Sequence, residues 1–165
     1  MIGKRLAKMG TVVAIEPNPS TFAALQRNVA VNELNNVLCL QVACWDEEGF
    51  LTLFSRRLGS SGNSLVHRYG PGPAVQVCPL DTLVERYGIR DVRLIKIDVE
   101  GAEARVLRGA QKTIARDSPR LIVEVWPPNY GEVTRLLQQW GYHIQWADRH
   151  VLKGWVGGYL VAERR

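Results

Sequence analysis

The sequence predicts an α/β fold built on an open, mostly parallel sheet with an antiparallel strand at its C-terminal end. Short runs of apolar, β-branched residues alternate with segments of helical period along the chain. The run over 92–97 is followed at once by carboxylates and then by a helical pattern, which is typical of the carboxyl end of a buried parallel strand. The last two predicted strands are separated only by a turn, which favours an antiparallel hairpin.

The start of the chain predicts a parallel crossover unit. Residues 1–9 carry apolar side chains at helical spacing and predict the end of a helix. A strand is expected over 11–15. Asn18 is expected to cap a helix over 19–31, whose first residue is a proline. A second strand over 37–42 completes the strand–helix–strand order of parallel neighbours.

The middle of the chain is less regular. Residues 50–54 predict a strand at a sheet edge, and residues 74–77 predict another. Asp81 is expected to cap a short helix that ends at Gly88. The segment 55–73 is rich in Gly, Ser and Arg and has no usable period, so it is expected to be an inserted loop.

The second half of the chain returns to alternating helices and strands. Val106, Leu107, Ala110 and Ile114 share one helical face, as do Val133, Leu136, Leu137 and Trp140. The predicted elements are, in order, the strand over 92–97, a helix from about Gly101 to Pro119, a strand over 121–125, a helix stopped by Gly141, a strand containing Tyr142, Ile144 and Trp146, a turn at 148–150 and a strand over 155–162.

Composition bounds the class of protein. The chain has 165 residues, 46% hydrophobic and 22% charged, which fits one globular domain over 1–165. No apolar run approaches the ~18 residues of a membrane span, and the N-terminus lacks the apolar core of a secretory signal. Three cysteines without a CxxC pair suit a reducing cytoplasm. The net charge of +5 is scattered, so specific nucleic-acid binding is not expected.

Asp98 is the first candidate for a functional site. It ends a buried strand, where an unpaired carboxylate is costly unless something binds it. Glu100 and Glu103 follow within a few residues, and two interpretations of them stay open. They can belong to the same site, or they can offset the positive end of the helix dipole.

Glu16 is the second candidate. A carboxylate that ends a strand of a doubly wound unit can accept hydrogen bonds from ribose hydroxyls. The alternative is a solvated strand end. Asn18 can add a polar contact there, although capping the next helix also accounts for it.

Four stretches of the sequence resemble one family. They are Ile95-Lys-Ile-Asp-Val-Glu-Gly-Ala-Glu103, Val106-Leu-Arg-Gly-Ala110, Pro119-Arg-Leu-Ile-Val-Glu124 and Val12-Val-Ala-Ile-Glu-Pro-Asn-Pro19. In this order they resemble the FkbM family of S-adenosylmethionine-dependent methyltransferases. The resemblance implies a Rossmann-like methyltransferase sheet, S-adenosylmethionine as cofactor, and a hydroxyl of a small metabolite or sugar as methyl acceptor.

The resemblance also implies roles for particular residues. The cofactor is expected to contact Glu16, Asn18, Asp98, the backbone of Ala43 and the side chain of Asp46, the last two near the adenine. Asp46 can equally be a solvated loop charge, like its neighbours in 43–49. Asp98 and Glu124 are the expected catalytic residues, with Asp98 acting as a base or as a ligand of the cofactor's amino group. Glu100 is a third candidate.

Several alternatives stay open at this stage. No metal is expected, although Asp98, Glu100 and Glu124 offer the oxygen ligands that a hard cation prefers. The three histidines are isolated in the sequence and are expected to be surface or packing residues. Contacts to the acceptor are expected from the segment 55–73. The sequence does not predict an oligomeric state.

One feature of the family is expected to be absent. The sequence has no strand and Gly-rich turn ahead of the Glu16 strand, so the resemblance implies a chain that lacks the first strand and the cofactor loop. A non-catalytic remnant that keeps the fold is therefore an alternative function, and a nicotinamide oxidoreductase is another. The central expectation is that Glu16 and Asp98 converge on one nucleoside-sized hollow.

Overall fold

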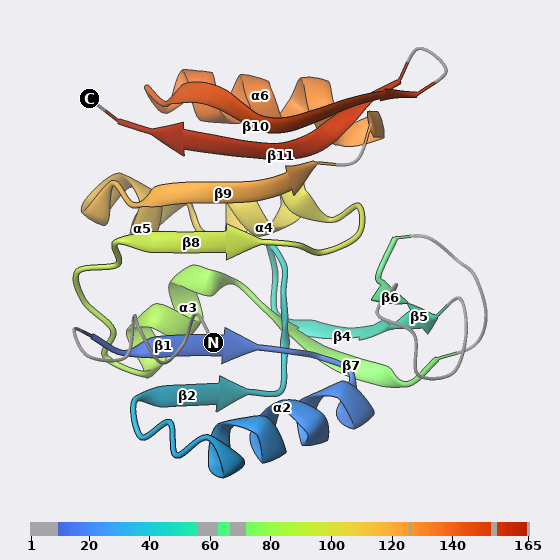
Figure 1. Cartoon of the computed structure of the whole chain (residues 1–165), viewed down its shortest axis with the longest axis vertical. Helices are drawn as coiled ribbons and strands as arrows, with labels where there is room; N and C mark the ends of the chain where they lie inside the picture. Colours follow the sequence, from blue (N-terminus) through green and yellow to red (C-terminus); the bar gives the residue numbers. More distant parts are fainter. Residues whose placement is uncertain (1–9, 56–62, 67–71, 126, 153–154, 165) are drawn as a thin grey trace.

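A computed structural model describes residues 10–55, 63–66, 72–125, 127–152 and 155–164. Within these ranges the strands form mixed sheets that are flanked by helices (Figure 1). The helix expected over 1–9 lies outside the described residues. None of the helices in the described ranges has the length and hydropathy needed to span a bilayer.

The predicted crossover unit is confirmed. Strand β1 (Val12–Ile15) pairs in parallel with β2 (Val37–Leu40), and helix α2 (Pro19–Val31) connects them. Asn18 caps this helix, because its side chain accepts hydrogen bonds from the N–H groups of Ser20 and Thr21. The cap fixes where β1 ends and α2 begins, and Glu16 lies between them.

The second half of the chain forms a sheet with the order β10-β11-β9-β8. Strands β8 (Leu94–Ile97) and β9 (Arg120–Val125) are parallel, and β11 (Trp155–Glu163) runs antiparallel to β9. The last two strands, β10 (His143–Leu152) and β11, form the predicted hairpin. The antiparallel C-terminal strand is therefore confirmed.

The turn predicted at 148–150 is wrong. Asp148, Arg149 and His150 continue β10 and pair with β11, and a register shift lies between Trp146 and Asp148. β10 is the edge strand of its sheet, and edge strands tolerate charged residues that would be costly in a central strand. The three polar residues therefore belong to an edge strand and not to a turn.

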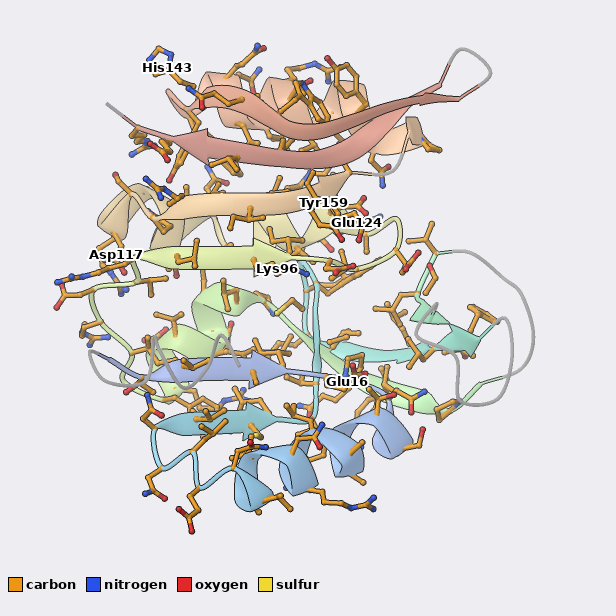
Figure 2. All side chains as sticks on the ribbon, in the orientation of Figure 1. Glu16, Lys96, Asp117, Glu124, His143 and Tyr159 are labelled. Carbon is orange, nitrogen blue, oxygen red and sulfur yellow. The ribbon has the colours of Figure 1, made fainter. Side chains whose placement is uncertain are left out.

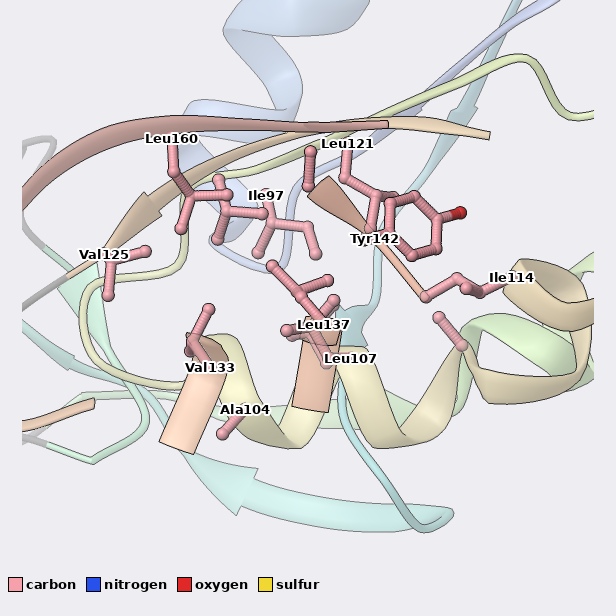
Figure 3. Packing of buried hydrophobic residues seen from close by; sticks show 14 residues of the cluster. Ile97, Ala104, Leu107, Ile114, Leu121, Val125, Val133, Leu137, Tyr142 and Leu160 are labelled. Atoms are coloured by element: carbon pink, nitrogen blue, oxygen red, sulfur yellow. The ribbon is translucent and has the colours of Figure 1, made fainter. Parts of the chain in front are cut away.

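Three helices cover one face of this sheet: α4 (Glu103–Gly109), α5 (Gln111–Asp117) and α6 (Tyr130–Gln139). The single helix predicted from Gly101 to Pro119 is in fact two helices that meet at Ala110. The core between helices and sheet is shown in Figure 3. Its members include Ile97, Val106, Leu107, Ala110, Ile114, Leu121, Val123, Val125, Val133, Leu137, Tyr142 and Leu160.

Strand β8 is buried on one face only, contrary to the expectation of full burial. Ile97 is 2% exposed and lies in the core, whereas Leu94 is 43% exposed. Because side chains alternate along a strand, Lys96 lies on the same exposed face as Leu94. The other face of this sheet therefore presents polar groups toward solvent at the point where β8 ends.

The inserted middle of the chain forms two small sheets. Strand β7 (Ala74–Cys78) pairs in parallel with β3 (Ala43–Cys44) and antiparallel with β4 (Gly49–Thr52), which confirms the predicted edge strand. Ala43 thus belongs to a short strand and not to the predicted loop. Strands β5 (Phe54–Ser55) and β6 (Asn63–Ser64) pair with each other. All three cysteines are free.

Asp81 has a different role from the predicted one. Helix α3 (Leu80–Arg86) begins after Pro79, so Asp81 lies inside its first turn. The Asp81 carboxylate instead accepts hydrogen bonds from the N–H groups of Lys112 and Thr113, at 2.9 and 2.8 Å. The break at Ala110 leaves these N–H groups at the start of α5 without a cap of their own, and Asp81 provides it.

Strands β1 and β8 point in the same direction (Figure 1), although within the described ranges they belong to separate sheets. Their carboxyl ends therefore lie at the same edge of the molecule. The predicted absence of a first strand stays a prediction. What the topology does establish is that Glu16 and Asp98 each follow a strand that ends at this edge.

Candidate active site

Acidic side chains gather at the carboxyl ends of β1, β8 and β9, at one edge of the molecule. Figure 2 shows Glu16, Lys96, Glu124 and Tyr159 toward the same end of the strands. Asp98 joins this group because its carboxylate is bonded to the Lys96 side chain. Glu16 and Asp98 therefore lie toward the same end of the strands. Side chains at opposite ends would have contradicted a shared site.

Glu16 is half-buried at the end of β1. Its Oε1 accepts a hydrogen bond from the N–H of Asn18 at 2.8 Å, and its own N–H donates to the carbonyl of Leu40 at 3.1 Å. Burial raises the pKa of Glu16, and the hydrogen bond from Asn18 offsets part of that rise. Among the described residues, Oε2 of Glu16 has no hydrogen-bond partner, so it is available to a bound hydroxyl.

Capping of α2 accounts for the side-chain hydrogen bonds of Asn18. Its Oδ1 accepts from the N–H groups of Ser20 and Thr21 at 2.9 and 3.3 Å, and from the Ser20 hydroxyl at 2.7 Å. These contacts need no ligand. A contact between Asn18 and a cofactor stays a prediction.

Asp98 and Lys96 form the first half of a polar cluster. The Lys96 Nζ lies 2.5 Å from Asp98 Oδ2. Partial burial would by itself raise the pKa of Asp98, but hydrogen bonds from Glu124 and Lys96 and the charge of Lys96 outweigh it and hold that pKa below its usual value. Asp98 is therefore ionised at neutral pH.

Glu124 and Tyr159 form the second half. They are register partners on β9 and β11, which places both side chains on the exposed face of the sheet beside Lys96. Burial, the hydrogen bond to Asp98 and the negative charge of Asp98 raise the pKa of Glu124 to about 7, while a hydrogen bond from Tyr159 partly offsets the rise. Burial and the nearby Glu124 and Asp98 charges also raise the pKa of Tyr159.

The cluster is thus a carboxyl pair flanked by a cation and a phenol. One carboxyl, Asp98, is ionised, and the other, Glu124, exchanges its proton near neutral pH. Burial is the largest cause of the raised Glu124 pKa, and Asp98 adds to it because two like charges in contact cannot both ionise cheaply. A carboxyl group with a pKa near 7 is suited to accept or donate a proton at neutral pH.

Sequence reasoning missed Lys96 and Tyr159. Lys96 stands in the strand that was expected to be buried, and an alternating pattern along that strand was the one available signal. Tyr159 meets Glu124 only through the register of β11 against β9, which local sequence does not specify.

Ala43 and Asp46 each have partners within the chain. Ala43 is buried in β3, where it pairs with Val77. Asp46 is held by helix α4, because Arg105 donates to both of its carboxylate oxygens at 3.1 and 2.9 Å. The Arg105 guanidinium also lies over the Trp45 ring, 5.2 Å from its centroid. Asp46 is therefore not a free loop charge, and its contact with adenine stays a prediction.

A groove of about 420 Å³ adjoins the turn after β8. Its charges are paired, since Arg105 bonds Asp46 and Arg108 bonds Glu132. Leu65 and Val66, from the described part of the segment 55–73, contribute apolar surface. The lining residues are Trp45, Leu65, Val66, Gly101, Ala104, Arg105, Arg108, Asn129 and Glu132.

Within the described ranges, no group of three or more His, Cys, Asp or Glu residues has a metal-binding arrangement. His143 is exposed on β10 (Figure 2). The side chains of His67 and His150 lie outside the described residues.

Comparison with known proteins agrees with the geometry. A family model, the Methyltransferase FkbM domain, matches residues 1–144. The sequence is 30% identical over 175 residues to "Methyltransferase sdnD" of Sordaria araneosa, covering 86% of this chain and 68% of that protein. It is 30% identical over 127 residues to "Methyltransferase 1" of Beauveria bassiana, covering 64% of this chain and 51% of that protein.

Solved structures show the same fold. The crystal structure of Methyltransferase FkbM from Methylobacillus flagellatus KT superposes with a TM-score of 0.61 at 18% identity, over 93% of this chain and 36% of that chain. A precorrin-6y C5,15-methyltransferase from Geobacter metallireducens GS-15 superposes with a TM-score of 0.51 at 10% identity, over 94% of this chain and 68% of that chain. This chain thus spans about a third of the solved FkbM chain. By its matching family model and its relatives, the chain belongs to the methyltransferase FkbM domain family.

Proposed function

We propose that this methyltransferase uses S-adenosylmethionine as methyl donor and transfers the methyl group to a hydroxyl of a small metabolite or sugar. The Asp98–Glu124 pair is the observation that supports the proposal best. It combines an ionised carboxylate with a carboxyl group of pKa about 7 at the end of adjacent parallel strands. This edge of an α/β sheet is where such folds bind ligands.

The side chain of Glu16 fits the ribose of the proposed cofactor. Glu16 presents an oxygen, Oε2, that lacks a partner among the described residues, at the position where a carboxylate accepts hydrogen bonds from ribose hydroxyls. When bound, the cofactor supplies a methyl group on a sulfonium, which is already electrophilic. The protein therefore has to align the acceptor and manage one proton.

Glu124 is the proposed proton acceptor. With the cofactor bound, the methyl group would leave its sulfur for the acceptor oxygen, and the hydroxyl proton would pass to the Glu124 carboxylate. Asp98, kept ionised by Lys96, stabilises the protonated form of Glu124 by accepting its hydrogen bond. Tyr159 donates to Glu124 and so orients its carboxyl group.

We also propose that the β1–β2 sheet and the β10-β11-β9-β8 sheet are parts of one Rossmann-like open sheet, with the place of the family's first strand between β1 and β8. The shared direction of these strands and their places at the ends of their own sheets support this proposal. A continuous sheet would bring the carboxyl ends of β1 and β8 to one crevice.

Calorimetric titration tests the proposed donor. S-adenosylhomocysteine should bind the chain with a micromolar Kd, and NAD should give no saturable heat. Both ligands carry a ribose that Glu16 can bond, so NAD controls for the ribose contact alone. Saturable NAD binding without S-adenosylhomocysteine binding would contradict the proposal and favour a dinucleotide enzyme.

A further inference from the structure

Gly101 is held at both of its backbone groups by side chains. Its N–H donates to Glu103 Oε1 at 2.9 Å, and its carbonyl accepts from Asn129 Nδ2 at 2.6 Å. The same Nδ2 donates to Glu103 Oε2 at 2.5 Å. Glu103 is 0% exposed, and its hydrogen bonds to Gly101 and Asn129 are partly buried. We call this closed ring of hydrogen bonds between Gly101, Glu103 and Asn129 the Glu103 clamp.

The orientation of the Asn129 amide follows from its partners. A carbonyl oxygen can only accept a hydrogen bond, so the NH₂ group of Asn129 must face Gly101. The Glu103 carboxylate oxygen beside it is also an acceptor. The two N–H bonds of the amide therefore both point into the clamp.

The clamp holds a turn that the backbone would not adopt freely. Glu100 has φ +50° and Gly101 has φ +104°. The left-handed conformation of a non-glycine residue such as Glu100 is unfavourable and persists only where the surroundings impose it. Ser64, which is 1% exposed, adds a second restraint, because its hydroxyl donates to the carbonyl of Glu100 at 2.7 Å.

This turn begins at Asp98. Only Val99 separates Asp98 from Glu100, so the direction of the turn sets where the Asp98 carboxylate points. Lys96 contacts that carboxylate from β8, while the clamp restrains the far end of the turn from α4 and from Asn129. The two ends of the turn are thus fixed by different elements.

We propose that Glu103 and Asn129 are positioning residues, which fix the turn over 98–101 so that the Asp98 carboxylate stays within hydrogen-bonding reach of Glu124. The consequence for methyl transfer rests on the proposed function. The geometric claim does not, because it concerns only residues of this chain.

The titration of Glu124, followed by its side-chain ¹³C NMR signal, reports the position of Asp98 without any ligand. The charged and titratable groups around Glu124 are Lys96 from β8, Asp98 and Glu100 from the turn after it, and Tyr159 from β11. Moving Asp98 away removes a raising influence on the pKa of Glu124. Glu103→Gln and Asn129→Leu should therefore lower its midpoint from about 7, by about one pH unit, which is about tenfold in proton affinity.

Matched variants separate positioning from general disturbance. Glu132→Gln makes the same substitution at a half-exposed residue that pairs with Arg108 and does not contact the clamp, so the Glu124 midpoint should stay unchanged. Ser64→Ala loosens the turn from its other side, and it should lower the midpoint less than Glu103→Gln does. If Glu103→Gln fails to fold, Asn129→Leu and Ser64→Ala decide the test.

An unchanged Glu124 midpoint in folded Glu103→Gln or Asn129→Leu protein would overturn the positioning role, as would an equal shift in Glu132→Gln. Absence of S-adenosylhomocysteine binding by the unaltered chain would contradict the proposed function and leave this titration valid. The two failures are therefore distinguishable.

Discussion

Asp98 and Glu124 are chemically equivalent side chains that their surroundings make different. Replacing Asp98 with Asn removes the negative charge that opposes ionisation of Glu124, and it frees Lys96 to interact with Glu124 instead. The Glu124 midpoint, about 7 in the unaltered chain, should then fall by one pH unit or more, roughly. ¹³C NMR of the Glu124 carboxyl measures it. A midpoint that stays near 7 would show that burial alone sets the pKa.

The raised pKa of Glu124 also makes the free energy of unfolding depend on pH. Its pKa is raised from 4.5 to about 7 in the folded chain, so the folded chain binds this proton more tightly than the unfolded chain does. The stability it contributes is present below the unfolded value and is lost as pH rises through the folded value. Glu124→Gln should therefore remove a decline of the free energy of unfolding between about pH 5 and 7, on the order of 1 kcal/mol after allowance for solvent screening. Urea unfolding at several pH values measures it, and an identical decline in the variant would contradict the assignment.

Site residues can be predicted from the sequence where the signal is local, and they are missed where the contact depends on strand register or helix packing. Glu16 and Asp98 can be predicted from the sequence because each ends an apolar run, where a carboxylate is costly unless a partner stabilises it. Tyr159 and Asn129 could not, because their partners Glu124 and Glu103 come to them through strand register and helix packing. Asp46 illustrates the converse, since an acidic loop residue proved to be paired with Arg105.

Helix α4 depends on the absence of a side chain at its end. A Cβ on Gly109 would lie 1.9 Å from the Trp45 carbonyl oxygen, and backbone there cannot yield as a side chain can. Gly109→Ala should therefore lower the free energy of unfolding by about 1–3 kcal/mol. Gly131→Ala is the matched control in α6, where a Cβ meets nothing within 4 Å, and it should be neutral or stabilising by up to about 1 kcal/mol. Equal effects of the two substitutions in urea unfolding would contradict the close approach of α4 to Trp45.

Helix α5 depends on a cap from outside itself. Asp81→Ala removes the acceptor of two N–H groups and of the Thr113 hydroxyl, so it should cost about 1–2 kcal/mol in the free energy of unfolding. Asp81→Asn keeps one acceptor oxygen and should cost less. Thermal unfolding followed by circular dichroism compares them. A loss confined to α3, with α5 amides equally protected from hydrogen exchange in both variants, would contradict the capping role.

At the scale of elements, periodicity predicts most helices and strands, and the structure differs from the sequence-based expectation in two places. The apolar residues of 103–117 were correctly assigned to one face, but the break at Ala110 reflects packing against the sheet and the cap from Asp81. The polar residues at 148–150 predict a turn but form an edge strand, because composition alone does not distinguish the two.

The whole molecule brings the ends of β1, β8 and β9 to one edge, although these strands lie far apart in sequence. Alternating strands and helices predicted that arrangement in outline, because parallel strands joined by helices end on the same side. Which face of the sheet is exposed could not be predicted. It depends on which side chains find a helix to pack against, and a single polar residue, Lys96, marks the exposed face of β8.

The central proposal for this molecule is that Glu16 and Asp98 contribute to one nucleoside site. Calorimetric titration with S-adenosylhomocysteine of the unaltered chain, Glu16→Gln, Asp98→Asn and the exposed control Glu85→Gln tests this most directly. Glu16→Gln and Asp98→Asn should each raise the Kd by about tenfold or more, and Glu85→Gln should leave it unchanged. Equal affinity in all four folded proteins, or no binding to any of them, would contradict it.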